Sequence, residues 1–248
     1  MCLIVLAWRP GHPLPLVLAA NRDEFYARPS LPLAAWEDAP GIYGGRDLEA
    51  GGTWLGIGPD GRFAALTNIR DPRQPPFGRS RGELPVQFLR SPLAPDAFLM
   101  DLAERAGEYS GFNLLAGDAH QLWHLNSRAG APERLTAGLY GLSNADLDTP
   151  WPKVQRAKAV LTECLAAPQA QDLLGLLHDA QQAADAILPD TGVGLNTERL
   201  LSSIFVATRS YGTRASTVLL ARADGSRQIV ERSYGPYGAH LGEVQLEL

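Results

Sequence analysis

The chain has 248 residues, a formal net charge of −5, 45% hydrophobic residues and two cysteines, Cys2 and Cys164. These values are typical of a globular protein, and the absence of a basic cluster argues against a nucleic-acid partner. Two cysteines do not make a disulfide framework. No apolar stretch approaches the ~18 residues of a membrane helix, and the apolar N-terminal run lacks the basic residues of a signal peptide. We therefore expect a cytoplasmic protein with no membrane span.

Hydrophobic periodicity predicts strands at both ends of the chain and helices between them. The first strands are expected at 2–8, 16–20, 53–57 and 62–68. A loop rich in proline and arginine at 71–81 precedes helices at 82–90 and 96–107. Further strands are expected at 111–117, 121–126, 140–144, 203–207, 213–223 and 228–234, and further helices at 151–167 and 171–188.

Turn sequences join two of these strand pairs into hairpins: 58–61 reads Gly-Pro-Asp-Gly and 224–225 reads Asp-Gly. Hairpins at both ends do not fit a doubly wound parallel sheet. They predict an α+β fold whose helices cover antiparallel sheets. A four-layer αββα sandwich satisfies this order, although pattern alone does not separate it from a two-layer sandwich.

Cys2 follows Met1 and opens the first apolar strand. Methionine is normally removed before a small residue, so we expect the mature chain to begin with Cys2. Its thiol, with a pKa of about 8.5, could then pass its proton to its own amine, with a pKa of about 7.7–8.0. N-terminal-nucleophile hydrolases are activated in this way. On position alone, the commoner interpretation is a buried apolar cysteine.

A polar cluster, Asn21-Arg22-Asp23-Glu24, ends the second strand. If the first two strands pair as a hairpin, the cluster lies beside Cys2. Asp23 would accept a hydrogen bond from the amine, and Arg22 would favour the thiolate and lower the pKa of Cys2. The simpler interpretation is a solvated turn.

Three more polar residues stand at strand ends, namely Asn68, Asn144 and Arg214. Each has an ordinary use, the asparagines in turns and Arg214 in a surface ion pair. A side-chain amide at such a position can also donate into an oxyanion hole. His120 and His124 have no third candidate ligand nearby, so we expect no metal site. The glycine-rich segments 44–47 and 51–54 match no phosphate-binding spacing and are interpreted as turns.

Taken together, these motifs resemble those of the transport and Golgi organisation protein 2 family, also called the NRDE family. The resemblance extends in order from residue 2 to about residue 217. It rests on Met1-Cys2, Asn21-Arg22-Asp23-Glu24-Phe25, Gly44-Gly45-Arg46-Asp47, Gly52-Thr53-Trp54-Leu55-Gly56, Thr67-Asn68, Gly141-Leu142-Ser143-Asn144 and Thr213-Arg214-Ala215-Ser216-Thr217.

The family is similar to the N-terminal-nucleophile superfamily and to the choloylglycine amide hydrolases. That likeness implies the αββα sandwich as one domain over 1–248, with Cys2 as nucleophile. It implies site roles for Arg22, Asp23, Asn68, Asn144 and Arg214, although the spacing of arginine and aspartate differs from the hydrolase pattern. Family members are linked to Golgi organisation and secretion in animals, and to haem mobilisation or acyl-lipid handling.

Two hypotheses follow. In the first, the protein is a cysteine amidohydrolase acting on a small non-peptide C–N bond, with Asn68 or Asn144 stabilising the oxyanion. In the second, the same pocket carries haem or an acyl thioester without turnover, and Arg22, Arg46 and Arg214 bind its anionic groups. Either way we expect a small-molecule ligand and no resident cofactor. Residues Asn21, Glu24, Arg46 and Trp54 are predicted to contact that ligand.

Overall fold

The protein is described here by a computed structural model that covers residues 2–74 and 77–248. Met1, on which the expected N-terminal processing depends, lies outside the described residues, as does the middle of the loop at 71–81. Within the described ranges the strands form two sheets, and all of their pairings are antiparallel.

The first sheet has six strands among the described residues, in the order β10-β1-β2-β11-β12-β13. Long apolar runs form its middle, because these strands are buried on both faces. Its strands are β1 (Cys2–Trp8), β2 (Leu16–Phe25), β10 (Gly138–Leu142), β11 (Tyr211–Ala221), β12 (Arg227–Tyr234) and β13 (His240–Glu247).

The second sheet has seven described strands, and their order in space is their order in the chain. It is a meander, so each strand pairs with the next through a short connection, except that α1 and α2 stand between β6 and β7. Its strands are β3 (Ser30–Ala35), β4 (Tyr43–Asp47), β5 (Leu55–Ile57), β6 (Phe63–Asn68), β7 (Phe112–Gly117), β8 (Leu122–Asn126) and β9 (Glu133–Leu135).

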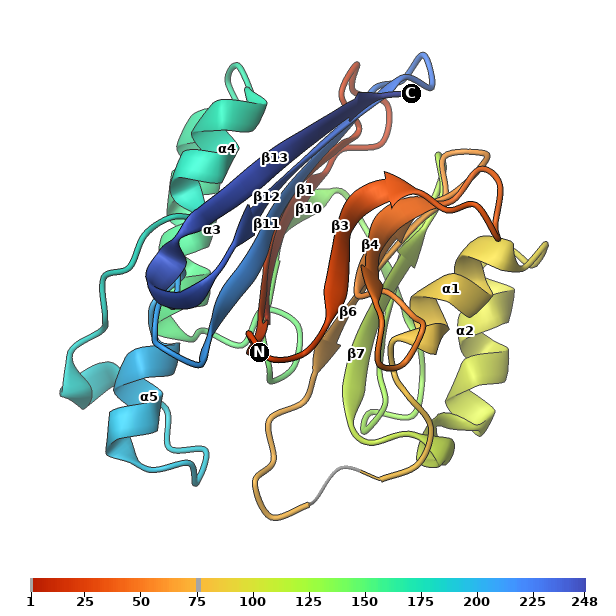
Figure 1. The fold of residues 1–248 in the computed structure, drawn as a ribbon. Coiled ribbons are helices and arrows are strands. Elements are labelled where there is room, and N and C mark those ends of the chain that lie inside the picture. Colours follow the sequence, from red (N-terminus) through yellow and green to blue (C-terminus); the bar gives the residue numbers. More distant parts are fainter. Residues whose placement is uncertain (1, 75–76) are drawn as a thin grey trace.

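Helices cover the outer face of each sheet, which gives the layer order helix, sheet, sheet, helix (Figure 1). The first sheet is covered by α3 (Pro152–Cys164) and α4 (Ala170–Leu176), with α5 (Leu195–Leu201) below them in the view. The second is covered by α1 (Glu83–Arg90) and α2 (Pro95–Glu104). The αββα sandwich predicted from the sequence is therefore confirmed.

Strand alternation divides the buried side chains into three cores. In β1, Ile4 and Leu6 point between the sheets, whereas Leu3 and Val5 point to α3 and α4. A third core lies between the second sheet and its helices, where Phe88 and Phe112 are fully buried. The inner core holds the two sheets together and ends at the pocket described below.

Several predicted boundaries are wrong. The helix expected at 171–188 ends at Leu176, because most of the residues that follow Leu177 are exposed and have no apolar face to pack. Residues 203–206 are buried, but the segment 203–207 forms only an isolated bridge, between Ala207 and Gly212. The segment 44–47, expected as a turn, is most of β4. Four further elements of the structure, β3, β9, β13 and α5, are not predicted by the sequence pattern.

Candidate active site

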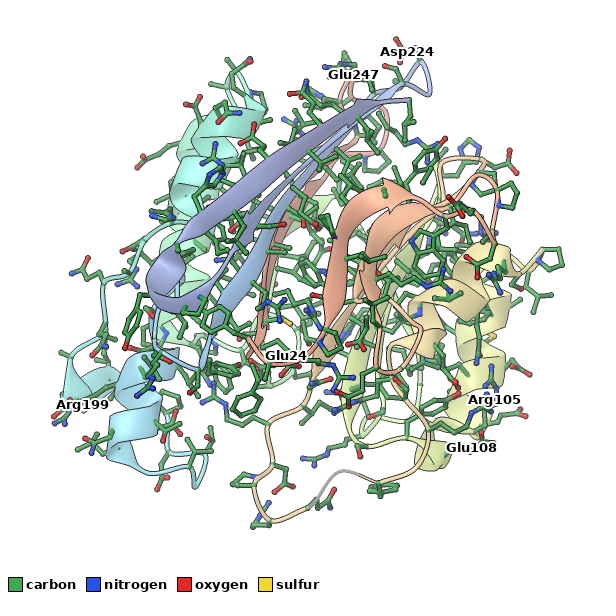
Figure 2. The ribbon with its side chains drawn as sticks, viewed as in Figure 1. Glu24, Arg105, Glu108, Arg199, Asp224 and Glu247 are labelled. Atoms are coloured by element: carbon green, nitrogen blue, oxygen red, sulfur yellow. The ribbon has the colours of Figure 1, made fainter. Side chains whose placement is uncertain are left out.

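A pocket of about 670 Å³ lies between the two sheets and is lined by residues from both. Cys2 and Glu24 line it at the end of the sheet where β1 begins, and Asp224 and Glu247 lie at the opposite end of the molecule from Glu24 (Figure 2). Five of the six predicted catalytic residues line it, and they come from four strands of the two sheets. These five are Cys2, Arg22, Asp23, Asn68 and Arg214.

Cys2 lies on the pocket wall because of strand alternation. Its side chain shares the inter-sheet face with Ile4 and Leu6, and it is 8% exposed. The predicted hairpin is present, with Cys2 directly opposite Arg22 in the β1–β2 register. On the other side, the Ser143 hydroxyl donates to the Cys2 carbonyl at 2.9 Å. Cys2 is thus positioned by strand pairing with β2 on one side and by the Ser143 hydrogen bond on the other.

The Cys2 thiol has a raised pKa, which corrects the expectation that nearby arginines lower it. Burial is the largest cause, and the Asp23 carboxylate also raises it. The main-chain amide of Asp23 and the Arg22 guanidinium act in the opposite direction but are outweighed. At neutral pH the sulfur is therefore protonated, and it needs a base to become a nucleophile.

Arg22 reaches across the pocket to the second sheet. Its guanidinium binds Asp47 of β4 at 3.1 Å, and Arg28 binds the same carboxylate. Burial raises the pKa of Asp47, but the Arg28 hydrogen bond and the Ala50 amide outweigh it and leave that pKa lowered. Asp47, which the sequence analysis quoted without a role, thus positions the arginine that faces Cys2.

Asp23 is buried, and its carboxylate points away from Arg22, toward the helical layer. The Thr213 hydroxyl donates to its Oδ1 at 2.8 Å, and the Tyr211 hydroxyl donates to its main-chain carbonyl at 3.3 Å. The pKa of Asp23 is raised, because burial outweighs Lys153, the Thr213 hydrogen bond and Arg70, which all lower it. Asp23 is therefore a hydrogen-bond acceptor beside the start of β1, and the cations that act on its carboxylate are Lys153 and Arg70.

The two asparagines differ in how their amides are used. Asn144 lies beside the pocket, not on its wall, and its amide donates to the Asn68 carbonyl at 2.8 Å. The Asn68 side chain lines the pocket and makes no hydrogen bond to another described residue. The Asn68 amide is therefore not engaged by any other described residue, whereas the Asn144 amide holds Asn68 in place.

Two cations on the pocket wall have no carboxylate within ion-pair distance among the described residues. Arg214 donates to the carbonyls of Phe25 and Arg28, at 3.0 and 2.7 Å. Arg81 donates to the Gly111 carbonyl at 3.2 Å, and burial lowers its pKa while Cys2 raises it. The sequence analysis missed Arg81, because nothing distinguishes it from the other arginines near the expected loop.

Glycine contacts bring Arg81 to the pocket. A Cβ on Gly52 would lie 2.2 Å from the Gly82 carbonyl oxygen, so only glycine permits this approach. The Thr53 amide donates to the same carbonyl at 2.9 Å. The loop after β4 and the start of α1 are thereby joined beside Cys2.

Of the predicted ligand contacts, Glu24, Arg46 and Trp54 line the pocket. Arg46 is bound by Asp38 and lies over the Trp36 ring, 4.4 Å from its centroid. Asn21 is outside the pocket, because alternation turns it to the helical face. Its amide donates to the carbonyls of Leu177 and Ile204, and the Ser216 hydroxyl donates to its Oδ1.

No group of three or more metal-binding side chains occurs among the described residues. His124 is buried against Asn113, and burial lowers its pKa to about 4, whereas His120 is exposed. Over the part of the chain that the structure describes, none of the helices is long and apolar enough to cross a membrane.

Residues 1–236 match the family described as Transport and Golgi organisation 2. The chain belongs to this family. It is 36% identical over 256 residues to the mouse Transport and Golgi organization 2 homolog, covering 94% of this chain and 93% of the relative. The human homolog is 37% identical with the same coverage, and the Drosophila melanogaster protein is 27% identical over 265 residues.

Among solved structures, the chain is similar to a Caenorhabditis elegans ortholog of N-acylethanolamine-hydrolyzing acid amidase. The TM-score is 0.44 at 13% identity, covering 90% of this chain and 96% of the other. It is also similar to the C2A mutant of a conjugated bile acid hydrolase from Clostridium perfringens. Here the TM-score is 0.48 at 11% identity, covering 100% of this chain and 92% of the other.

Proposed function

We propose that this member of the Transport and Golgi organisation 2 family is an N-terminal cysteine amidohydrolase that cleaves a small non-peptide C–N bond. The observation that carries the proposal is the placement of Cys2. Its thiol is on the wall of a 670 Å³ pocket, and Arg22, Asp23 and Asn68 surround it. A cysteine that is buried in a strand for packing alone requires neither a pocket beside its thiol nor polar side chains around it.

The proposed reaction uses both groups of Cys2. Removal of Met1 frees the amine. The raised pKa of the thiol keeps its proton on the sulfur at neutral pH, so the amine acts as the base that removes it. The sulfur attacks the amide carbonyl carbon, Asn68 stabilises the oxyanion, and the amine passes the proton to the leaving nitrogen. The C–N bond breaks and a thioester forms on Cys2. Water then attacks the thioester, releases the carboxylic acid and restores the thiol.

Hydrolysis of a panel of N-acyl amides, followed by mass spectrometry of both products, tests the proposal. Wild-type protein should release acid and amine, and Cys2→Ala should release neither. Cys164→Ala is the matched control, because Cys164 is at the end of α3, away from the pocket, and should keep full activity. Equal activity of wild type and Cys2→Ala would refute the proposal.

A second candidate function, carriage of an anionic ligand without turnover, is favoured by Arg81 and Arg214. Both line the pocket without a carboxylate partner among the described residues, so a phosphate or carboxylate would find uncompensated charge there. The described lining residues include no histidine or methionine, so Cys2 and Tyr234 are the lining side chains that could bind a haem iron. Tight binding of an acyl thioester that Cys2→Ala leaves unchanged would favour this candidate.

A further inference from the structure

The chain carries 22 basic residues, and just two of them, Lys153 and Lys158, are lysines. Both lie on α3, but their surroundings differ. Lys158 is at the surface and pairs with Asp148 at 2.6 Å. Lys153 is 1% exposed, and its Nζ has no hydrogen-bond partner among the described residues. A buried cation without a direct partner is costly, so its position calls for a reason.

Helix stability does not supply that reason. Lys153 follows Pro152 in the first turn of α3, where the helix dipole disfavours a cation. The first turn of α3 also packs closely against the first sheet. A Cβ on Gly141 of β10 would lie 2.5 Å from Val154 Cγ1, so the missing side chain lets α3 approach closely. Close packing therefore keeps the Lys153 ammonium away from water.

The charged groups around Lys153 come from four segments. Asp23 of β2 and Cys2 of β1 lie on the sheet side, and both favour the charged lysine. Arg70, which follows β6, disfavours it, and Glu198 of α5 favours it. Arg70 and Glu198 are 2.7 Å apart and largely satisfy each other. Lys153, Arg70 and Glu198 also share a cavity of about 10 Å³. Among these groups, Asp23 favours the charged form of Lys153 most strongly.

We propose that Lys153 is a positioning residue of this site, whose buried ammonium is the counter-charge that keeps the Asp23 carboxylate ionised beside the start of β1. The inference rests on the proposed function, because it concerns the acceptor of the Cys2 amine. An ionised Asp23 orients that amine by accepting its hydrogen bond. The ionised Asp23 favours the protonated amine, and the positive charge of Lys153 offsets that effect, so the amine remains able to act as a base.

Lysine suits this task better than arginine. An arginine side chain stays protonated in proteins, whereas burial readily shifts the pKa of a lysine. Here burial lowers the pKa of Lys153 from 10.5 to about 8, with Asp23 acting in the opposite direction. The counter-charge is therefore present at neutral pH and is lost as the pH rises through about 8.

Lysine-selective NMR of the full chain tests the pairing directly, because there are two ammonium signals and Lys158→Met assigns them. The Lys153 signal should titrate near pH 8. Asp23→Asn removes the anion that favours the charged lysine, so the midpoint should fall by about one pH unit. An unchanged midpoint in Asp23→Asn would overturn the inference.

The pH profile of Cys2 alkylation by iodoacetamide tests the consequence. Lys153→Met removes a buried positive charge that favours the thiolate, so alkylation should slow by about tenfold below pH 8, where Lys153 is charged in the wild type. Lys158→Met is the matched control and should keep the wild-type profile. Lys153→Arg should match the wild type below pH 8 and alkylate faster than the wild type above it, where the lysine loses its charge and the arginine does not. An unmoved profile in Lys153→Met would contradict the inference, and the NMR titration decides if that variant does not fold.

Measurement of amide hydrolysis distinguishes a failure of this inference about Lys153 from a failure of the proposed function. Wild-type pH dependence in Lys153→Met, with hydrolysis intact, would overturn this inference and leave the proposed function standing. A Lys153–Asp23 coupling found in a protein that hydrolyses no amide would overturn the proposed function instead.

Discussion

Neighbouring residues at the end of β2 serve opposite faces of one sheet. Arg22 faces the pocket, opposite Cys2, and binds Asp47 of the second sheet. Asn21 faces the helical layer, where it ties β2 to the segments behind it. Asp23 is buried, lines the pocket and accepts a hydrogen bond from Thr213. A motif that is continuous in sequence is thus divided between the reacting side of the sheet and the side that supports it. Adjacent positions should therefore respond differently to substitution.

The largest expected effect concerns the two asparagines. Asn68→Ala should lower kcat by about 10²–10³-fold, because it removes the free amide donor on the pocket wall. Asn144→Ala should have a smaller effect on kcat and a larger one on stability, because its amide binds the Asn68 carbonyl. Steady-state kinetics and urea unfolding of both variants measure the difference. A larger loss of kcat in Asn144→Ala than in Asn68→Ala would exchange their assigned roles.

A smaller effect is expected on the pocket face of β2. Arg22→Met removes a positive charge that favours the thiolate, so the already raised pKa of Cys2 should rise further. If that pKa rises by about one, the thiolate becomes about tenfold rarer at neutral pH. The rate of Cys2 alkylation as a function of pH measures this change. A profile that moves downward, or not at all, would show that Arg22 does not act on the sulfur.

The smallest effect on chemistry is expected on the opposite face. Asn21→Ala should cost about 2–3 kcal/mol of unfolding free energy, because it leaves two buried carbonyls and the Ser216 hydroxyl without their partner. The Cys2 alkylation profile of the folded variant should match that of wild type. Chemical denaturation and alkylation together test this, and a shifted profile with unchanged stability would reverse the assignment of the two faces.

The sequence predicted the parts of the site that depend on local pattern. Continuous apolar runs identified β1 and β2, and their pairing placed Arg22 opposite Cys2. Strand alternation was not used, although it is readable from the sequence. It turns Asn21 away from the pocket. β3, β4 and β13 were not predicted as strands, because β3 contains a proline and is largely exposed, β4 is rich in glycine, and β13 is largely exposed.

Other parts of the site depend on tertiary packing that no local pattern encodes. Arg81 reaches the pocket because Gly52 and Gly82 meet, far from each other in sequence. Lys153 reaches Asp23 because Gly141 lets α3 approach the sheet. The raised pKa of Cys2 results from burial, whereas charge pattern alone suggested the opposite sign. The motifs identified Cys2 as the candidate nucleophile, but they did not predict that burial outweighs the nearby positive charge and raises its pKa.

Mass spectrometry of the protein during turnover of an activated acyl substrate tests the central claim most directly. The account predicts a chain that begins at Cys2 and carries one acyl group, mapped to the Cys2 sulfur as a thioester and lost on hydrolysis. A chain that retains Met1 and still hydrolyses the substrate, or an acyl group found on Cys164, would contradict it.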